Sequence, residues 1–131
     1  KTCLYPDELL VEIVFSQLAL NEKVRFEKVS TRKHVDISTV SLASRLVVAE
    51  NGTVEEILLA FGGMAAMVKR ATHAEQFLLH KELTECNIKK ASEYISNDFT
   101  PISDARSDKE YRLQVAKNLV LKCLLSGVLS E

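Results

Sequence analysis

The residues of this chain that are able to bind metals or activate nucleophiles do not combine into a complete site. The three histidines, His34, His73 and His80, show neither the Cys-x-x-Cys nor the His-Glu-x-x-His spacing that holds zinc. No serine, histidine and aspartate are arranged as a catalytic triad requires, and no two carboxylates are predicted to lie close together. We therefore expect solvent-facing histidines, no metal site and no catalytic residue in this chain.

The cysteines offer one weak candidate for reactivity. Cys86 follows Thr84, which is predicted to begin a helix, and a helix N-terminus lowers the pKa of a thiol. A structural or idle thiol remains the favoured interpretation of Cys86, and Cys123 is expected in the core because it lies on a predicted apolar stripe. The chain has 3 cysteines, an odd number, and they are widely spaced, which favours free thiols and a reducing, cytoplasmic compartment.

Lys28 is the clearest candidate for a binding residue. Alternation of apolar and charged residues over 23–34 predicts a strand in which Val24, Phe26 and Lys28 share one face. A lysine in line with Val24 and Phe26 is expected to point toward the packed side of the sheet or into a cleft. Such a lysine must pair with an anion or extend its amine to water. A second basic residue, Arg32, follows near the end of this strand.

Size and composition predict a single domain over residues 1–131. The chain is 47% hydrophobic and 27% charged, which is ordinary for a globular protein that buries a core without disulfides or metals. Its formal net charge of -1 gives no reason to expect binding to nucleic acid or to a membrane surface. No apolar run approaches the length of a membrane span.

The first half of the sequence predicts strands. Three apolar-rich segments have strand composition: Leu9–Phe15, 23–34, and the second half of Ile37–Ala49, whose first half suits a helix or a strand. Asn51 and Gly52 predict a type I′ hairpin turn because both residue types tolerate positive φ. Val54–Phe61 is then the returning strand, and the half forms an antiparallel sheet.

The second half changes to helical periodicity. Helix starts are predicted at the capping box Thr72–Glu75, at Thr84 and at a second capping box, Ser107–Glu110. The last of these opens the longest helix, from Asp108 to about Leu125, with a C-cap at Ser126-Gly127. Strands followed by helices predict an α+β fold, in which an antiparallel sheet of three to four strands packs against a C-terminal three-helix layer as a sandwich.

Four segments in order along the chain suggest a family. Lys1–Leu10 is similar to a T-x-L-x-P-x-E-I-L segment, and Phe26–Ser38 to an F-x-K-x-S-x-R-x-x-x-D-I-A segment. Leu59–Ala65 is similar to L-x-x-G-G-M-A, and Ser103–Arg112 to S-D-x-R-x-S-x-E-Y-R, with Asp108 in place of the second serine. Together they resemble the C-terminal domain of the FAD-binding subunit of xanthine dehydrogenase and other molybdenum hydroxylases, the carbon monoxide dehydrogenase flavoprotein C-terminal domain family.

The resemblance implies FAD as cofactor and two residues that contact it. In that family the domain closes over an FAD held mostly by a preceding domain, which residues 1–131 do not include. At the matching positions Lys28 would contact FAD through its side chain, and Leu10 mainly through its backbone. The resemblance further implies a molybdenum cofactor and iron–sulfur clusters on partner subunits. Electrons from a purine or another N-heterocycle would pass through these to FAD and then to NAD or another acceptor.

Two departures from the family pattern bear on the implied flavin site. Val35 stands where the family has a second acidic residue before Asp36-Ile37, and Lys33 replaces an arginine, which removes bidentate geometry. We expect the isolated domain to be inactive and to bind FAD weakly or not at all. The alternative is a non-catalytic domain that docks subunits through the same fold without flavin. A glycine-rich FAD-binding domain before Lys1 would favour the flavoprotein.

Overall fold

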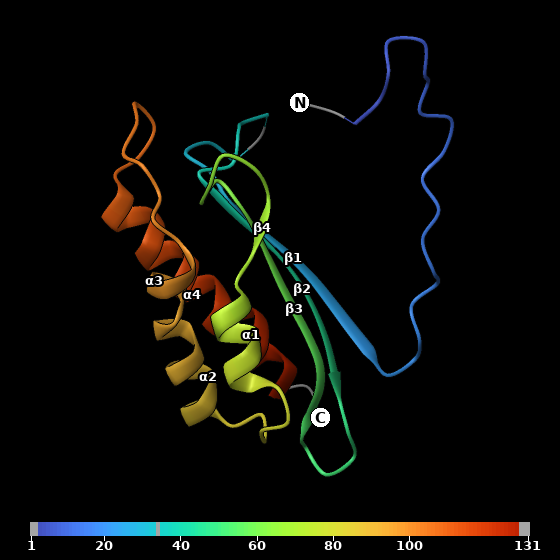
Figure 1. The fold of residues 1–131 in the computed structure, drawn as a ribbon. Coiled ribbons are helices and arrows are strands. Elements are labelled where there is room, and N and C mark those ends of the chain that lie inside the picture. The colour runs from blue at the N-terminus through green and yellow to red at the C-terminus, as the bar shows by residue number, and fades with distance from the viewer. Residues whose placement is uncertain (1–2, 34, 129–131) are drawn as a thin grey trace.

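The computed structural model of the chain describes residues 3–33 and 35–128 and has the predicted α+β architecture. Its antiparallel 4-stranded sheet has the order β1-β2-β3-β4. The strands are β1 (Glu22–Val29), β2 (Val40–Val48), β3 (Val54–Gly62) and β4 (Lys69–Arg70). The helices are α1 (Thr72–Leu78), α2 (Glu85–Glu93), α3 (Ile95–Asp98) and α4 (Lys109–Val128). The helices cover one face of the sheet, and the described residues leave the other face open (Figure 1).

The core lies between the sheet and the helices because each turns an apolar side toward the other. In β2, Val40, Leu42 and Leu46 alternate with more exposed residues, as the period of a strand requires. From the helical side, Ile88 of α2 and Val120 of α4 are fully buried. This alternation, visible in the sequence, sets which face of β2 meets the helices.

The β2–β3 hairpin is confirmed, but the predicted turn type is wrong. Of the two central turn residues, Gly52 has a positive φ, 82°, and Asn51 does not, whereas a type I′ turn needs positive φ at both central positions. The N–H of Gly52 donates to the carbonyl of Ala49, and the N–H of Ala49 donates to that of Thr53, both at 2.9 Å. The side-chain oxygen of Asn51 accepts the N–H of Thr53 at 3.0 Å. A single left-handed glycine therefore closes the hairpin.

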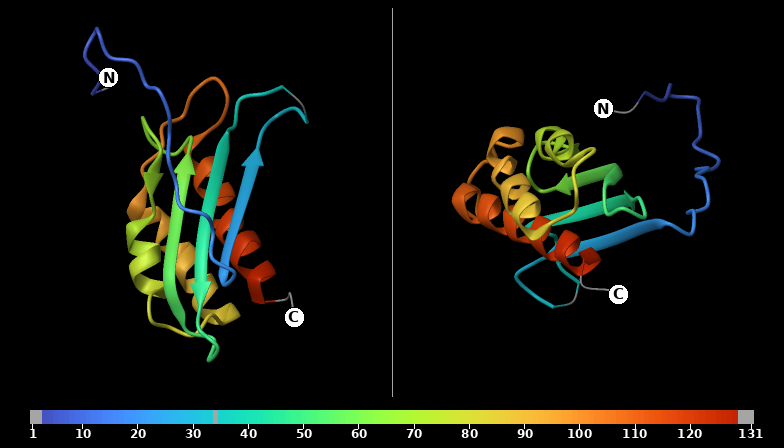
Figure 2. Two further views of the ribbon diagram at one scale, coloured as in Figure 1. Left: turned by 90° about the vertical axis from the view of Figure 1, so that its right-hand side faces the viewer. Right: turned by 90° about the horizontal axis from the view of Figure 1, so that it is seen from below.

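The strand predicted over Leu9–Phe15 is wrong within the described residues. The segment is extended but pairs with no described strand, and its apolar side chains are exposed by 61% at Leu10 to 86% at Phe15. Figures 1 and 2 show this segment running apart from the open face of the sheet. Strand composition alone does not suffice, because an isolated strand has no neighbour to satisfy its backbone hydrogen bonds.

β1 presents its faces in the opposite sense to the prediction. Glu27 accepts a hydrogen bond from Lys122 of α4 at 2.7 Å, and Val29 packs against the core, so these residues face the helices. Phe26 and Lys28 therefore lie on the open face, where Phe26 is 77% exposed. Of the two alternatives for Lys28, the packed side is wrong and the cleft remains, since Lys28 lines a hollow on the open face. β1 is an edge strand. At Glu27, the face of β1 that meets the helices carries an ion pair with Lys122 and not an apolar residue, so alternation of apolar residues does not identify that face.

The predicted helices are confirmed, although the start of α1 differs. α2 begins as predicted, since the hydroxyl of Thr84 accepts the N–H of Asn87 at 3.3 Å. The Thr72–Glu75 capping box is wrong: the N-cap of α1 is Ala71, which has no capping side chain. The carboxylate of Asp98, at the end of the short additional helix α3, accepts the free N–H groups of the first turn of α1 instead.

The last helix is longer than predicted. α4 starts at Lys109, whose N–H donates to the hydroxyl of Ser103 at 3.0 Å. It continues to Val128, so the predicted C-cap at Ser126-Gly127 is wrong. In the described parts of the chain, no helix combines the length and apolar character needed to cross a membrane.

Candidate functional site

Lys28 lies at one end of the sheet, where three strands are in register. It is opposite Ser41 of β2, and Ser41 is opposite Gly62 of β3. The small side chains of this row leave a hollow of about 300 Å³ on the open face, with Phe26 and Val68 among the residues that line it. The amine of Lys28 therefore stands beside a shallow, mostly apolar floor.

The same amine holds the loop that joins β1 to β2. Lys28 Nζ donates to the backbone carbonyl of Asp36 at 2.5 Å. The carboxylate of Asp36 accepts the backbone N–H groups of Arg32 and Ile37, both at 2.9 Å. These hydrogen bonds hold the pKa of Asp36 below its ordinary value, and the bond from the N–H of Arg32 has the largest effect. Because an ammonium group has three donors, Lys28 retains donors for a second acceptor.

Val35 projects from this loop. Its side chain is 97% exposed and its φ is 47°, a left-handed conformation that is unusual for a β-branched residue. The loop therefore displays an apolar group at the position where the resembled family carries a second acid.

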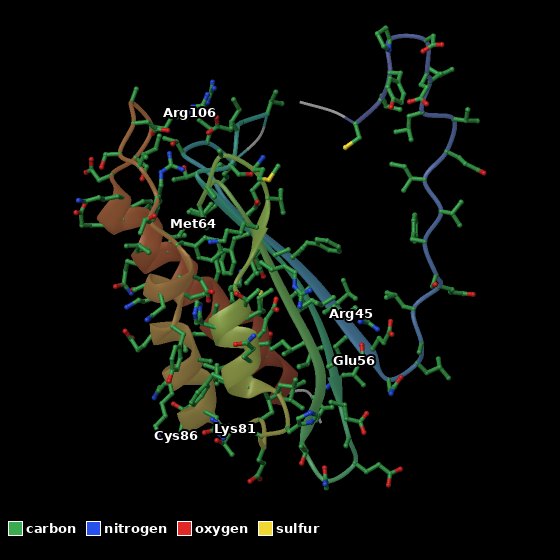
Figure 3. All side chains as sticks on the ribbon, viewed as in Figure 1. Arg45, Glu56, Met64, Lys81, Cys86 and Arg106 are labelled. Carbon is green, nitrogen blue, oxygen red and sulfur yellow. The ribbon has the colours of Figure 1, made fainter. Side chains whose placement is uncertain are left out.

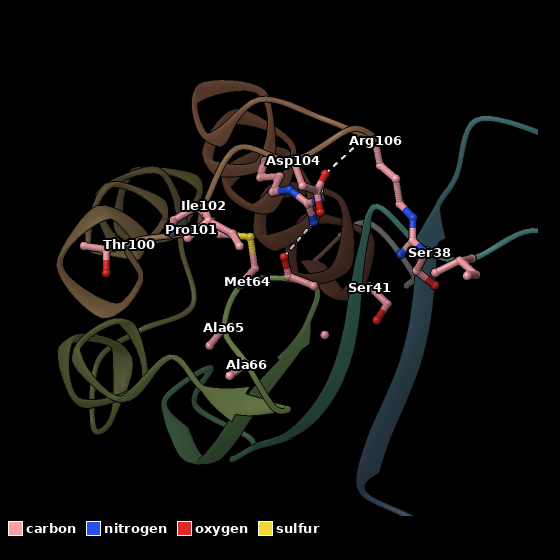
Figure 4. Close-up of a pocket in the computed structure, with 14 residues that line it drawn as sticks. Ser38, Ser41, Met64, Ala65, Ala66, Thr100, Pro101, Ile102, Asp104 and Arg106 are labelled. Carbon is pink, nitrogen blue, oxygen red and sulfur yellow. Dashed lines mark hydrogen bonds and ion pairs between the residues drawn. The ribbon is translucent and has the colours of Figure 1, made fainter.

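A larger cavity of about 650 Å³ opens next to the Lys28 hollow (Figure 4). The two share Ser38, Ser41 and Gly62 as lining residues. The cavity forms where the β1–β2 loop, the segment after β3 and the loop before α4 meet. Its apolar wall consists of Ile37, Met64, Ala65, Ala66, Pro101 and Ile102, and its polar residues include Asp104 and Arg106. It has the size and the mixed lining of a small-molecule site.

Arg112 of α4 ties the walls of this cavity together. It is 5% exposed, and its Nη1 donates to the carbonyls of Thr39 at 2.8 Å and Gly63 at 2.9 Å. Its Nη2 donates to both carboxylate oxygens of Asp104 at 2.8 Å. The backbone N–H of Arg106 and the Arg112 guanidinium hold the pKa of Asp104 below its ordinary value. The Nε of Arg112 is buried without a partner among the described residues.

The structure does not bring the two predicted FAD-contact residues together. Lys28 is on the sheet, whereas Leu10 belongs to the extended segment that runs apart from it (Figures 1 and 2). As expected for solvent-facing histidines, the side chain of His73 is 57% exposed and His80 is exposed. His34 lies outside the described residues.

Neither the cysteines nor the described His, Asp and Glu side chains form a reactive thiol or a metal centre at this site. Cys123 is buried in the core as predicted, and burial raises the pKa of its thiol. Cys86 is exposed on α2, at the opposite end of the molecule from the cavity residues Met64 and Arg106 (Figure 3). Residues 3–33 and 35–128 contain no group of three His, Cys, Asp or Glu side chains placed to hold a metal ion.

Sequence reasoning missed two residues that build the site. Asp36 organises the β1–β2 loop, and Arg112 joins that loop to β3 and α4. Both residues lie in the segments that resemble the family, so the motifs include them without indicating what they do. No local pattern reveals their role, because each acts on backbone groups that only the folded chain brings near.

The chain belongs to the carbon monoxide dehydrogenase flavoprotein C-terminal domain family, whose sequence model matches residues 25–126. It is 32% identical over 129 residues to the xanthine dehydrogenase FAD-binding subunit of Escherichia coli O157:H7, covering 98% of this chain and 44% of that protein. It is 31% identical over 86 residues to the glyceraldehyde dehydrogenase medium chain of Sulfolobus acidocaldarius, covering 66% of this chain and 30% of that protein. The chain thus spans less than half the length of these relatives.

Solved structures show the same fold. A chain of carbon monoxide dehydrogenase from Hydrogenophaga pseudoflava, in a form that lacks the Mo-pyranopterin moiety, superposes with a TM-score of 0.75 and 27% identity, covering 82% of this chain and 37% of that one. A chain of quinoline 2-oxidoreductase from Pseudomonas putida 86 superposes with a TM-score of 0.70 and 26% identity, covering 83% and 37%.

Proposed function

We propose that this chain is the C-terminal domain of the FAD-binding subunit of a xanthine dehydrogenase-like molybdenum hydroxylase, where it covers and helps to hold FAD. The placement of Lys28 carries the proposal. Its amine stands on the open face of the sheet, beside the hollow that the small residues leave. After bonding to the carbonyl of Asp36 it still has donors for a ligand. Such a group suits the polar or anionic edge of a flavin cofactor.

The described residues fit one side of an FAD site and not a whole one. Lys28 would donate to the cofactor through its side chain, and Leu10 would contact it through its backbone once the extended segment is in place. No glycine-rich loop for a pyrophosphate is present in the sequence, so other residues must supply most of the binding. When bound, FAD supplies hydride and electron transfer; this domain binds, orients and shields it.

The wider setting of the domain follows from the same proposal. Its partners are subunits that carry the molybdenum cofactor and iron–sulfur clusters, and the subunit passes electrons to NAD or another acceptor in the cytoplasm. The larger cavity adjoins the Lys28 hollow, because the two share Ser38, Ser41 and Gly62 as lining residues. An acceptor bound in this cavity would therefore lie next to the FAD. On its own, the domain is inactive.

A second candidate function, docking of subunits without flavin, is favoured by one observation. The segment before β1 exposes a run of apolar side chains, and Phe26, Met67 and Val68 are exposed by 71% to 77%. Apolar surface of this extent marks a contact with another body. The flavin proposal also needs such a contact, so exposure alone does not separate the two functions, whereas the content of flavin does.

The experiment compares Lys28→Ala with Lys90→Ala in the complete FAD-binding subunit. Lys90 is an exposed lysine on α2, far from the open face, and controls for loss of one positive charge. Loss of a charge-assisted hydrogen bond of about 1.5–3 kcal/mol weakens FAD binding by about tenfold or more. We expect Lys28→Ala to lose FAD on dialysis and Lys90→Ala to keep it, measured as flavin absorbance per subunit. Equal flavin content and an unchanged spectrum would refute the contact. A wild-type subunit that assembles with its partners but contains no flavin would establish the docking function.

A further inference from the structure

Arg106 differs from Arg32 and Arg112, the other arginines that line the hollows at this end of the sheet, because its guanidinium has no partner among the described residues. Its backbone N–H donates to Asp104 at 2.9 Å, but among the described residues its side chain makes no hydrogen bond or ion pair. Arg112, by contrast, uses its guanidinium to hold three segments together. Arg106 is exposed and extends from the loop before α4 toward Ser38 (Figure 4). A free guanidinium at a cavity is ready to bind an oxyanion.

Two hollows of different character meet at Arg106. On one side is the cavity of about 650 Å³, walled by apolar residues such as Ile37 and Ile102. On the other is a hollow of about 480 Å³ whose lining is rich in hydroxyl groups. Its hydroxyl-bearing residues are Ser30, Thr31, Thr39, Ser107 and Tyr111. Arg106 lines both hollows.

The charges around Arg106 leave its positive charge available to a ligand. Asp104 is held in a bidentate pair with Arg112, so it is already neutralised. Asp36 is bonded to the loop N–H groups and lies 3.7 Å from the guanidinium of Arg32. Asp108 also lines the hydroxyl-rich hollow, but it forms no ion pair with Arg106 within the described residues.

We propose that Arg106 is a specificity-determining residue that binds the phosphate of a nucleotide electron acceptor, and this inference rests on the proposed flavoprotein function. The apolar cavity takes one aromatic ring of the dinucleotide with its attached ribose, the guanidinium takes oxygens of the pyrophosphate, and the hydroxyl-rich hollow takes the ribose on the far side of the pyrophosphate. The first cavity lies within the range of about 300–1,000 Å³ that small-molecule sites occupy. In the reaction with NAD, one hydride carries both electrons from the reduced cofactor to NAD and yields NADH. Arg106 holds the phosphate and takes no part in that transfer.

The test measures binding of NAD to the complete FAD-containing complex by titration calorimetry, without turnover. The variants are Arg106→Ala, Arg106→Lys and the control Arg25→Ala, which removes an exposed arginine of β1 whose side chain donates to the carbonyl of Ser126 at 3.5 Å. We expect the Kd for NAD to rise about tenfold or more in Arg106→Ala, because a charge-assisted hydrogen bond is lost. Arg106→Lys restores part of the affinity, since it keeps the charge without the planar fork. Arg25→Ala binds NAD as the wild type does.

A second measurement separates a role in binding phosphate from general damage. The chemically reduced complex is mixed with NAD or with an uncharged quinone, and the return of oxidised flavin absorbance is followed. Arg106→Ala slows reoxidation by NAD and leaves reoxidation by the quinone unchanged. Equal slowing with both acceptors, equal NAD affinity of Arg106→Ala and wild type, or no NAD binding by the wild type would each overturn the proposal. Flavin content in Lys28→Ala tests the underlying function separately, because Arg106→Ala is expected to retain its full complement of FAD.

Discussion

The carboxylate of Glu75 in α1 acts as a strand neighbour for Leu59 in β3, accepting its backbone N–H at 2.7 Å. Both residues are buried, with exposed fractions of 5% for Glu75 and 0% for Leu59. β4 pairs only with Ala60 and Phe61, so the edge of β3 would otherwise leave this N–H unsatisfied. Arg70 donates to both oxygens of the same carboxylate and completes the contact.

Removal of the Glu75 carboxylate is predicted to destabilise the domain. Glu75→Ala leaves the Leu59 N–H buried and unpaired, which costs about 1–3 kcal/mol. Glu75→Gln keeps one oxygen that accepts from Leu59, but it loses the charge and replaces the oxygen that Arg70 binds with an NH2 donor. Because Arg70 is half-exposed and its donors can turn to water, this change is expected to cost less than Glu75→Ala, about 1 kcal/mol. Urea denaturation of the two variants and of the exposed control Glu55→Gln measures these differences. Equal stability of Glu75→Ala and Glu55→Gln would contradict the role given to Glu75.

Asp98 is predicted to control the order of α1 from outside that helix. Its side chain is 1% exposed and accepts the N–H groups of His73 at 2.9 Å and Ala74 at 3.2 Å. Capping side chains contribute about 0.5–2 kcal/mol, so Asp98→Ala should lower stability by about 2 kcal/mol. The change should also speed amide hydrogen exchange in α1. Thr84→Ala removes the ordinary cap of α2 and serves as the comparison, because it should speed exchange in α2 and leave α1 protected.

The parts of the fold that the sequence predicts are those set by near neighbours. The alternation in β2 and β3 and the cap at Thr84 operate within a few residues, and the structure agrees with them. β4 escapes prediction because its two residues, Lys69 and Arg70, have no alternation and form a strand only by pairing with β3. The start of α1 escapes prediction because its cap, Asp98, comes from α3.

The same limit applies to the candidate site. The type and family-like setting of Lys28 single it out in the sequence, but its face of the sheet depends on where α4 packs. Contacts between distant segments show that face: Glu27 pairs with Lys122 of the last helix, and Val29 packs against the core. The predicted contact at Leu10 stays a prediction, because the segment that carries Leu10 has no described neighbour to position it.

Acid is predicted to weaken the contact between Asp104 and Arg112 in a defined range of pH. The N–H of Arg106, and after it the Arg112 guanidinium, hold the pKa of Asp104 below its ordinary value of 3.8. Because the folded state favours the ionised carboxylate, its contribution to stability is complete above pH 3.8 and is lost as pH falls through the lower folded-state pKa. The difference in denaturation midpoint between wild type and Asp104→Asn should therefore be constant near neutrality and shrink in acid. A difference that stays constant down to pH 2, on the order of the lowest folded pKa values for bonded carboxylates, would disprove this linkage.

Thiol reactivity is predicted to divide the cysteines by burial. Burial raises the pKa of the Cys123 thiol, and its exposed fraction is 3%, so both its nucleophilicity and its access are reduced. Cys3 and Cys86 are exposed. Treatment of the native chain with iodoacetamide, followed by mass spectrometry of peptides, should modify Cys3 and Cys86 and leave Cys123 intact until denaturant is added. Modification of Cys123 at a rate similar to that of Cys86 would show that the α4 core opens readily.

The adjacent glycines at the end of β3 are predicted to differ sharply in their tolerance of alanine. At Gly63 a Cβ atom would lie 2.3 Å from the carbonyl oxygen of Thr39, and its φ of 79° strains any other residue. That carbonyl also accepts Nη1 of Arg112, so the backbone has little room to move. At Gly62 the clash would be with the hydroxyl of Ser41 at 2.6 Å, a side chain that can rotate away.

Gly63→Ala should therefore cost on the order of 3 kcal/mol, from strain and backbone displacement. Gly62→Ala should cost about 1 kcal/mol, and the double change Gly62→Ala with Ser41→Ala should recover most of that loss. Thermal and urea denaturation of the three variants measure the order. Similar losses for the two glycines would mean that the Thr39 carbonyl yields to a methyl group. In that case the anchoring of this rim by Arg112 would be weaker than its two hydrogen bonds to Thr39 and Gly63 indicate.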